Sequence, residues 1–208
     1  MLGIIRVLTH DDPHFVEEHG RLIQQEYGIT SVSRCIADQP RGIFDLTSEA
    51  LAVPKIVALG KTLEAQGCRA LFLSCAADPG LTSLREAVSL PVISAGSACA
   101  SIAAMLKRPV AVMGIGETAP TPFRVLLGEN VRYARPQGVT NTTDLLAPHG
   151  RDSALACAEG LYQEGVEVIA FSCTGFSTIA LADTIRTRLG NIAIDAVSAA
   201  GLFASQLT

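Results

Sequence analysis

The chain contains an internal repeat in which both copies end on a Ser-Cys pair. The segment Gly67–Cys75 (GCRALFLSC) parallels Gly165–Cys173 (GVEVIAFSC), and both the glycines and the cysteines are 98 residues apart. Each half supplies four strands in the same order, which predicts two similar lobes. Weaker parallels join residues 4–9 with 111–116 and residues 92–98 with 193–199.

Short β-branched runs alternate with amphipathic stretches along the chain. Two of these runs, Ala70–Leu73 and Val168–Phe171, are apolar throughout. Continuous apolar runs are typical of parallel strands that helices cover on both faces. Strands are predicted near residues 2–8, 30–36, 69–74, 91–94, 109–114, 131–134, 167–172 and 192–195.

The predicted fold is α/β, with two pseudo-symmetric lobes that each hold a four-stranded parallel sheet flanked by helices. We expect one lobe over residues 1–97 and the other over 98–208, with the last helix crossing back onto the first lobe. Pro54 interrupts one helical pattern, so that helix is expected to start late or kink. Helical patterns include Thr47–Gln66, Arg151–Glu164 and Phe176–Leu189.

The composition indicates a globular protein that handles small molecules. Of the 208 residues, 49% are hydrophobic and 17% charged, which excludes a disordered chain. A net charge of −4 and singly scattered basic residues argue against nucleic acid or an anionic membrane as the main partner. No apolar stretch reaches the ~20 residues of a membrane span. The apolar start, Met1–Leu8, is too short for a signal segment and contains Arg6.

The cysteines divide into two groups. None forms a CxxC pair or a zinc-site spacing, so we expect no metal, no disulfide scaffold and a reducing cytoplasm. Cys75 and Cys173 are retained in both copies of the repeat. The others are expected to be small core residues, because the repeat does not retain them: Cys35, Cys68, Cys99 and Cys157.

The positions of the two retained cysteines predict a shared site. In open parallel sheets, ligands bind beyond the carboxyl ends of the strands. Cys75 and Cys173 each end the third strand of a lobe, so we expect their thiols to face each other across a cleft between the lobes. Ser74 and Ser172 alternate to the other face and are expected to make structural hydrogen bonds.

Paired thiols suit proton transfer at a carbon atom. The thiolate is the reactive form of cysteine, and helix N-termini lower thiol pKa values. Both cysteines precede turns into helices, where Asp78 is expected to be a cap and Pro79 the first helical residue. Free N–H groups there would lower the thiol pKa and hold an oxyanion. Racemisation beside a carbonyl needs a base on one face and an acid on the other, so a thiolate and a thiol suffice without pyridoxal phosphate.

At these residues the chain resembles the aspartate/glutamate/hydantoin racemase superfamily, and in particular its hydantoin racemase branch. Cys75–Leu81 (CAADPGL) is similar to the first cysteine motif of that branch, and Cys173–Ser177 (CTGFS) to the second. The similarity runs through nearly the whole chain, including Pro91–Ile93. It implies two α/β lobes, no cofactor, and a two-cysteine racemase acting on 5-substituted hydantoins or allantoin. Motif residues expected at the substrate are Ala76, Asp78, Thr174 and Gly175.

Departures from the wider superfamily bear on the substrate. Glutamate racemases usually carry Asn-Thr after the first cysteine and Thr-His after the second, whereas this chain has Ala76-Ala77 and Thr174-Gly175. This disfavours a free α-amino acid. The first strand ends in Arg6-Val7-Leu8, where many hydantoin racemases have Asn-Pro-Asn.

Other functions stay open from the residues alone. They are an amino-acid racemase, a single-cysteine isomerase or decarboxylase of the same superfamily, and a non-catalytic small-molecule binding protein. A thiol redox protein would lack its usual CxxC context. The habits of this enzyme class favour a homo-oligomer.

A glycine-rich turn after the fifth strand has two interpretations. Gly114–Ala119 fits G-x-G-x-x-A, but no acidic residue follows about 20 positions later, and Pro120 and Pro122 crowd the helix start. A nucleotide site is therefore disfavoured. The turn either lines the cleft, with Glu117 or Thr118 reaching the substrate, or is a plain turn.

Several charged residues near strand ends are further candidates. Arg6 ends a core strand, where a buried guanidinium needs an anion: either a substrate oxygen or a structural Asp. Arg34 presents a similar, weaker case. Residues 10–14 (HDDPH) are expected to form a solvated loop that caps the first helix rather than a metal site. Ser94 and Asp195 follow the fourth strands and are expected to be caps.

Overall fold

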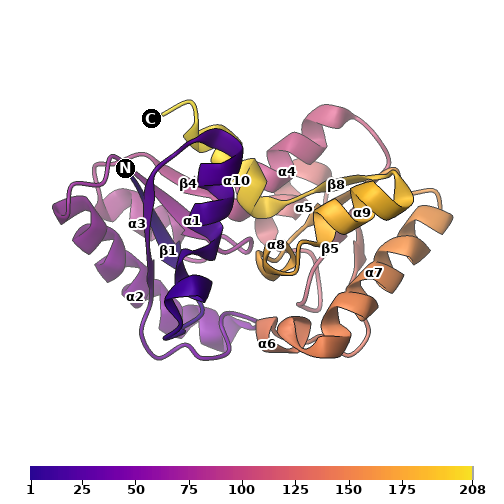
Figure 1. Ribbon diagram of the computed structural model, residues 1–208, viewed down its shortest axis with the longest axis horizontal. Helices are drawn as coiled ribbons and strands as arrows, with labels where there is room; N and C mark the ends of the chain where they lie inside the picture. The colour runs from indigo at the N-terminus through magenta and orange to yellow at the C-terminus, as the bar shows by residue number, and fades with distance from the viewer. Residues whose placement is uncertain (208) are drawn as a thin grey trace.

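The computed structural model describes residues 1–207 and shows two lobes, each built on its own four-stranded parallel sheet (Figure 1). The strand order is β2-β1-β3-β4 in the first lobe and β6-β5-β7-β8 in the second, so the two sheets have equivalent topologies. The predicted fold class is therefore confirmed, and each predicted strand is present, shortened by one or two residues at its ends.

The elements of the first lobe are β1 (Leu2–Arg6), α1 (Pro13–Tyr27), β2 (Ser31–Cys35), α2 (Leu46–Ala65), β3 (Ala70–Ser74), α3 (Leu81–Ala87), β4 (Val92–Ser94) and α4 (Ala95–Leu106). Those that follow are β5 (Val110–Met113), α5 (Thr121–Leu127), β6 (Arg132–Ala134), α6 (Thr142–Leu146), α7 (Pro148–Gln163), β7 (Val168–Phe171), α8 (Gly175–Thr178), α9 (Leu181–Leu189), β8 (Ile192–Ile194) and α10 (Ala196–Ala204).

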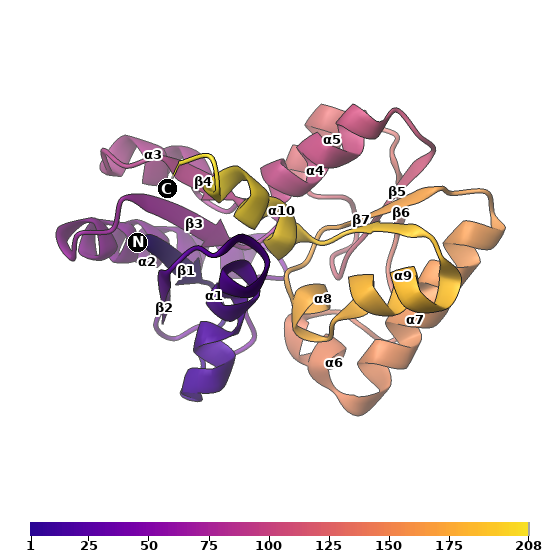
Figure 2. The same cartoon turned by 45° about the horizontal axis from the view of Figure 1, so that its top comes forward.

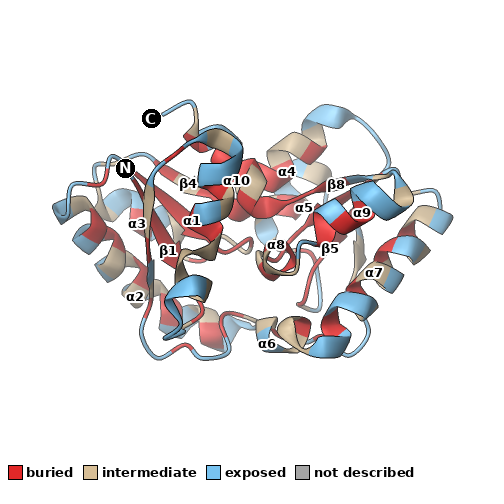
Figure 3. Cartoon of the chain, in the orientation of Figure 1, coloured by how far each residue is buried: buried red, intermediate tan, exposed pale blue. Residues whose placement is uncertain are grey.

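The central strands are buried on both faces, as their apolar sequences predict. Every residue of β1, β3 and β7 is buried, and the exposed residues lie mainly on the helices and loops around the sheets (Figure 3). Leu2 pairs with Ala70 and Arg6 with Ser74 between β1 and β3, and Val110 pairs with Val168 between β5 and β7. These registers bring the carboxyl ends of β3 and β7, and hence Cys75 and Cys173, to corresponding edges of the two sheets.

Two helices exchange places between the lobes. Helix α4 leaves β4 of the first sheet and packs against α5, β7 and β8 of the second lobe. Helix α10 leaves β8 of the second sheet and packs against α1, β3 and β4 of the first lobe (Figure 2). The two helices also contact each other, and one hydrophobic cluster holds Phe72 of the first lobe together with Val168 of the second. The expected boundary between residues 97 and 98 falls inside α4.

Small residues allow α10 to approach the first lobe closely. The helix buries alanines such as Ala199 and Ala200, and an ideal Cβ on Gly201 would lie 2.6 Å from ring carbons of Tyr27. Ser198 is fixed at the same junction by Glu26 and Tyr27 of α1: its hydroxyl lies 2.7 Å and 2.8 Å from the Glu26 carboxylate oxygens and 3.1 Å from the Tyr27 hydroxyl.

Two helical predictions need correction. The pattern at Phe176–Leu189 forms two helices, α8 and α9, because Ala180 adopts a left-handed conformation with φ of +49°. Helix α2 does not start late at Pro54. It begins at Leu46, and Asp45 and Ser48 form a reciprocal capping box that fixes this start. Within residues 1–207, no helix has both the length and the apolar character needed to cross a membrane.

The close approach of α10 predicts that Gly201→Ala lowers the free energy of unfolding by about 1–3 kcal/mol, because the added methyl group overlaps the Tyr27 ring. Urea denaturation followed by circular dichroism measures this change. Gly160→Ala in α7 is the matched control: nothing lies within 4 Å of its ideal Cβ, so it should raise stability by about 0.5–1 kcal/mol. Equal effects at the two sites would contradict the packing argument.

Candidate active site

A cavity of about 960 Å³ lies between the lobes, and both Cys75 and Cys173 line it. Each cysteine directly follows the third strand of its sheet, β3 or β7. The predicted placement of the two thiols at one cleft is therefore what the structure shows. The thiols are also close enough that negative charge on Cys173 raises the pKa of Cys75.

The Cys75 loop is a tight turn. The N–H of Cys75 donates to the Leu73 carbonyl (3.0 Å), and the N–H of Asp78 donates to the Cys75 carbonyl (3.1 Å). Burial raises the pKa of the Cys75 thiol, and one backbone N–H, from Ala77, opposes that rise. Ala76 lines the cavity beside the thiol, as predicted from the motif.

Asp78 holds the start of a different helix from the one expected. Its carboxylate accepts hydrogen bonds from the N–H groups of Gly96 and Ser97 (both 2.8 Å) and from the hydroxyls of Ser94 (2.8 Å) and Ser97 (2.5 Å). Asp78 therefore stabilises the N-terminus of α4, whereas α3 begins after Gly80 without a side-chain cap. The assignment of Asp78 as a cap of the following helix is therefore wrong. Asp78 is not among the residues that line the cavity, and its contact with a substrate stays a prediction.

Cys173 has two donors. The N–H of Gly175 points to its sulfur at 3.4 Å, and the side chain of Thr142 on α6 also hydrogen-bonds to it. Both favour the thiolate, but burial outweighs them and raises the pKa of Cys173 to about 11. Gly175 thus contacts the cysteine rather than the cavity, which Thr174 does line.

The helix N-termini do not lower the thiol pKa values below the ordinary range, contrary to expectation. Each thiol is buried and receives a single backbone N–H, from Ala77 or Gly175, and desolvation exceeds that contribution at both sites. The resulting thiolates are poorly solvated and strongly basic.

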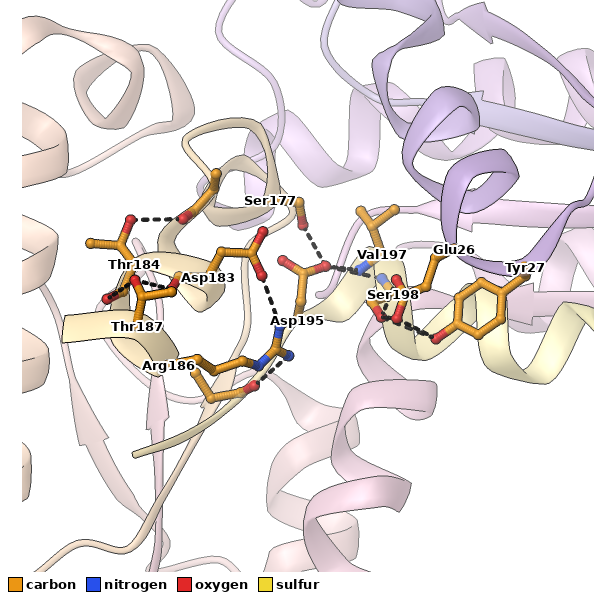
Figure 4. Close-up of polar contacts among 12 residues, drawn as sticks. Glu26, Tyr27, Ser177, Asp183, Thr184, Arg186, Thr187, Asp195, Val197 and Ser198 are labelled. Carbon is orange, nitrogen blue, oxygen red and sulfur yellow. Dashed lines mark hydrogen bonds and ion pairs between the residues drawn. The ribbon is translucent and has the colours of Figure 1, made fainter. Parts of the chain in front are cut away.

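Asp195 performs in the second lobe what Asp78 performs in the first. Its carboxylate accepts from the N–H groups of Val197 (2.8 Å) and Ser198 (3.0 Å) at the start of α10, which confirms its predicted role as a cap. It also accepts from the hydroxyl of Ser177 (2.9 Å) in α8, the short helix that follows Cys173 (Figure 4).

The serine and aspartate therefore exchange positions between the lobes. In the first lobe Asp78 lies in the turn after the cysteine and the fourth strand ends in Ser94. In the second lobe Ser177 lies in the short helix after the cysteine, and Asp195 follows the fourth strand. Ser94 occupies the N-cap position of α4, as predicted, but its hydroxyl donates to Asp78 and makes no side-chain cap hydrogen bond.

The two serines before the cysteines make the structural hydrogen bonds that were predicted. Ser74 Oγ lies 2.7 Å from Nδ1 of His19, and Ser172 Oγ donates to the Met113 carbonyl (3.2 Å). Ser172 also lines the cavity, which strand alternation did not predict.

Arg6 is buried but does not reach the cavity. Its guanidinium donates to the carbonyls of Phe15 (2.8 Å) and Val16 (3.0 Å) and lies over the Phe15 ring, with only 4% of the residue exposed. Burial lowers its pKa to about 10. Backbone carbonyls of α1, and not an Asp, therefore satisfy the guanidinium, and contact of Arg6 with the substrate stays a prediction. Arg34 is exposed and pairs with Glu17 at 3.9 Å, also away from the cavity.

The loop before α1 and the glycine-rich turn lie as the sequence indicated. Asp12 accepts from the N–H of His14 (2.9 Å) and caps α1, which confirms the interpretation of residues 10–14 as a capping loop. Glu117 and Thr118 line the cavity. A side chain at Gly114 would overlap Ser172 Oγ, so the glycine permits the turn to pack against the Cys173 loop.

Several cavity residues were not found from the sequence. Thr142 contacts Cys173 from α6, and Glu49 in the first turn of α2 lines the cavity and raises the pKa of Cys75 by its charge. Thr142 comes after β6 and Glu49 comes after β2. The rule that placed the cysteines at the carboxyl ends of strands could therefore have found both residues. Arg41 and Arg135 supply positive charge to the lining.

Comparison with known proteins identifies the family. A sequence model of the Asp/Glu/Hydantoin racemase family matches residues 19–202. A hydantoin racemase of Pseudomonas sp. (strain NS671) is 27% identical over 176 residues, covering 81% of this chain and 70% of that protein. A hydantoin racemase of Rhizobium meliloti is 28% identical over 180 residues, covering 82% and 73%.

The fold has the same relatives. An allantoin racemase from Klebsiella pneumoniae superposes with a TM-score of 0.82 at 22% identity, covering 99% of this chain and 86% of that structure. With 184 of its 208 residues within the family match, the chain belongs to the Asp/Glu/hydantoin racemase family and is an isomerase of this cofactor-independent racemase class.

Proposed function

We propose that the chain racemises a 5-substituted hydantoin or an allantoin-like compound by passing a proton between Cys75 and Cys173. The observation that carries the proposal is that equivalent cysteines of the two lobes line one cavity. The names of the relatives, hydantoin and allantoin racemases, support this substrate class.

The reaction balances without another reactant. A thiolate on one face takes the proton from the stereocentre, and the C–H electron pair moves into the neighbouring carbonyl to give an enolate. The thiol on the other face then donates its proton to the same carbon as the electron pair returns. The first cysteine ends as the thiol and the second as the thiolate, so the next turnover in the opposite direction uses them with their roles exchanged.

When the pair carries a single negative charge, the site favours that charge on Cys173. Charge on one thiol opposes ionisation of the other, so a thiol and a thiolate coexist. Gly175 and Thr142 donate hydrogen bonds to Cys173, which favours its ionisation. The negative charges of Asp78 and Glu49 oppose ionisation of Cys75. Cys173 is therefore assigned as the first thiol to ionise, with Cys75 remaining a thiol.

Hydantoin-like rings also suit the charges of the cavity. Such a ring carries N–H donors and carbonyl acceptors but no carboxylate. Within residues 1–207 the structure gives Glu49 no hydrogen-bond or ion-pair partner, so its carboxylate is available to accept a ring N–H. The same carboxylate would repel an α-carboxylate brought beside Cys75.

The decisive experiment follows proton–deuterium exchange by NMR in deuterated buffer, using each enantiomer of several 5-substituted hydantoins, allantoin and aspartate. Wild type should exchange the proton at the stereocentre of a hydantoin-class compound with inversion. Cys75→Ser and Cys173→Ser should each lower racemisation by at least about 100-fold, because each removes one of the two proton carriers. Each variant should still exchange the proton of one enantiomer without inverting it, and the enantiomer exchanged by Cys75→Ser should be the opposite of the one exchanged by Cys173→Ser.

The control is Cys157→Ser in α7, which changes a cysteine that does not line the cavity and should leave racemisation unchanged. Inversion that survives either active-site substitution would contradict the two-base mechanism and indicate a single-cysteine enzyme. Turnover of aspartate alone would indicate an amino-acid racemase. Binding without exchange, together with ordinary thiol reactivity, would indicate a binding protein.

The assigned charge distribution predicts that Thr142→Val slows alkylation of Cys173 by iodoacetamide at pH 8. Loss of a hydrogen bond to the thiolate raises the pKa of the Cys173 thiol further above the working pH. The thiolate fraction then falls about tenfold for every increase of one in that pKa. Mass spectrometry of the alkylated peptides measures the rate at each cysteine. An unchanged rate at Cys173 would remove Thr142 from the site, and Thr47→Val, also in the cavity lining, is the matched control.

At the other thiol, Cys75, we expect a substitution to raise the alkylation rate instead of lowering it. Glu49→Gln removes a negative charge that raises the pKa of Cys75, so the thiolate fraction and the alkylation rate of Cys75 should rise at pH 8. The rate at Cys173 serves as the internal reference. A slower Cys75 would show that Glu49 acts through packing and not through its charge.

A further inference from the structure

A buried histidine lies at the junction of the two lobes, outside the cavity lining. His19 of α1 is only 1% exposed. Its Nδ1 lies 2.7 Å from Ser74 Oγ in the first lobe, and its Nε2 lies 3.3 Å from Thr178 Oγ1 of α8 in the second lobe. One ring therefore hydrogen-bonds to both lobes.

The partners of this ring are the neighbours of the two cysteines. Ser74 directly precedes Cys75, and Thr178 belongs to the short helix that follows Cys173. The hydroxyl of Thr174, the residue after Cys173, also reaches the Ser74 carbonyl, at 3.5 Å. We call these four residues the interlobe clasp: His19, Ser74, Thr174 and Thr178.

The histidine is suited to this position because it is neutral. Burial lowers its pKa well below the ordinary range, and the positive charge of Arg6 lowers it further. A neutral imidazole has one donor and one acceptor, and the hydroxyls of Ser74 and Thr178 can play either part. Both ring nitrogens are thus satisfied without placing a further charge beside the thiols.

We infer that His19 is a positioning residue that sets the separation of the Cys75 and Cys173 loops across the cleft. The inference rests on the proposed two-base function, in which one carbon must contact both sulfurs from opposite faces. Such geometry tolerates little error, since a displacement of about 1 Å can lower a rate by about 100-fold. A residue that merely filled the core would not need polar contacts to both loops.

The first test compares variants that keep different halves of the clasp. His19→Asn places an amide near the position of Nδ1 and can retain Ser74, whereas His19→Gln reaches toward Thr178; His19→Ala keeps neither. His19→Ala should lower kcat by about 100-fold with little change in KM, and each amide variant should fall by about tenfold. Exchange without inversion should rise relative to racemisation, because the second sulfur no longer meets the carbon.

Controls separate position from folding. Thr178→Val removes one hydroxyl of the clasp and should also raise the fraction of exchange without inversion. Thr187→Val makes the same chemical change in α9, where the hydroxyl bonds only to carbonyls of its own helix, and should not alter that fraction. If His19→Ala and Thr178→Val, assayed well below their unfolding temperatures, keep the wild-type kcat and inversion ratio, the inference is overturned.

A second test needs no substrate. Bifunctional methanethiosulfonates with a graded series of spacers should link Cys75 to Cys173 in wild type with one preferred spacer length, read by mass spectrometry of the linked peptides. His19→Ala should broaden or shift that preference, and an unchanged sharp preference would overturn the inference. If wild type racemises nothing in the panel, the proposed function fails, and the cross-linking result alone decides the role of His19.

Discussion

A buried hydrogen bond between a serine and an aspartate ties each cysteine loop to the helix that crosses to the opposite lobe. Asp78 and Asp195 accept backbone N–H groups at the starts of α4 and α10, where the helix dipole also favours negative charge. Burial raises the pKa of both carboxyls, which their donors oppose. Because each of these helices packs on the lobe that does not contain its preceding strand, each cysteine segment is connected through its helix to the packing of the opposite lobe. The separation of the two sulfurs is thus coupled to the packing of the whole molecule.

The electrostatics of the cavity follow from how little solvation the thiols receive. Each sulfur is buried and has few donors, so the thiolate form is disfavoured in the empty site. In the proposed mechanism this property helps to remove a proton from carbon, since a poorly solvated thiolate with a raised pKa is a stronger base than an exposed one. His19 behind the cysteine loops is neutral and therefore leaves the basicity of the thiolate unchanged. A cation at that position would stabilise the thiolate and make it a weaker base.

Much of this architecture was predictable because it repeats in the sequence. The copies ending in Cys75 and Cys173 placed the two thiols at equivalent strand ends, and the apolar strands predicted the parallel sheets. The hydrogen-bond partners of polar side chains were harder to predict, because they depend on tertiary contacts between distant segments. Asp78 was assigned to the next helix in sequence, but its partners lie 16 to 19 residues away, at the end of β4 and in the first turn of α4. His19 carried no signal at all, because its two partners are 55 and 159 residues away.

The repeat is not perfect, and a racemase restricts what its asymmetry can do. The two enantiomers have equal free energy in achiral solvent, so kcat/KM must be the same in both directions whatever the thiol environments. Thr142 beside Cys173 and Glu49 near Cys75 therefore cannot make kcat/KM larger for one enantiomer than for the other. They can only change which protonation state the free enzyme prefers, and so alter kcat and KM in the same proportion for one enantiomer relative to the other. Under the proposed two-base mechanism, divergence between the two lobes is tolerated for this reason, provided that both sulfurs still reach the same carbon.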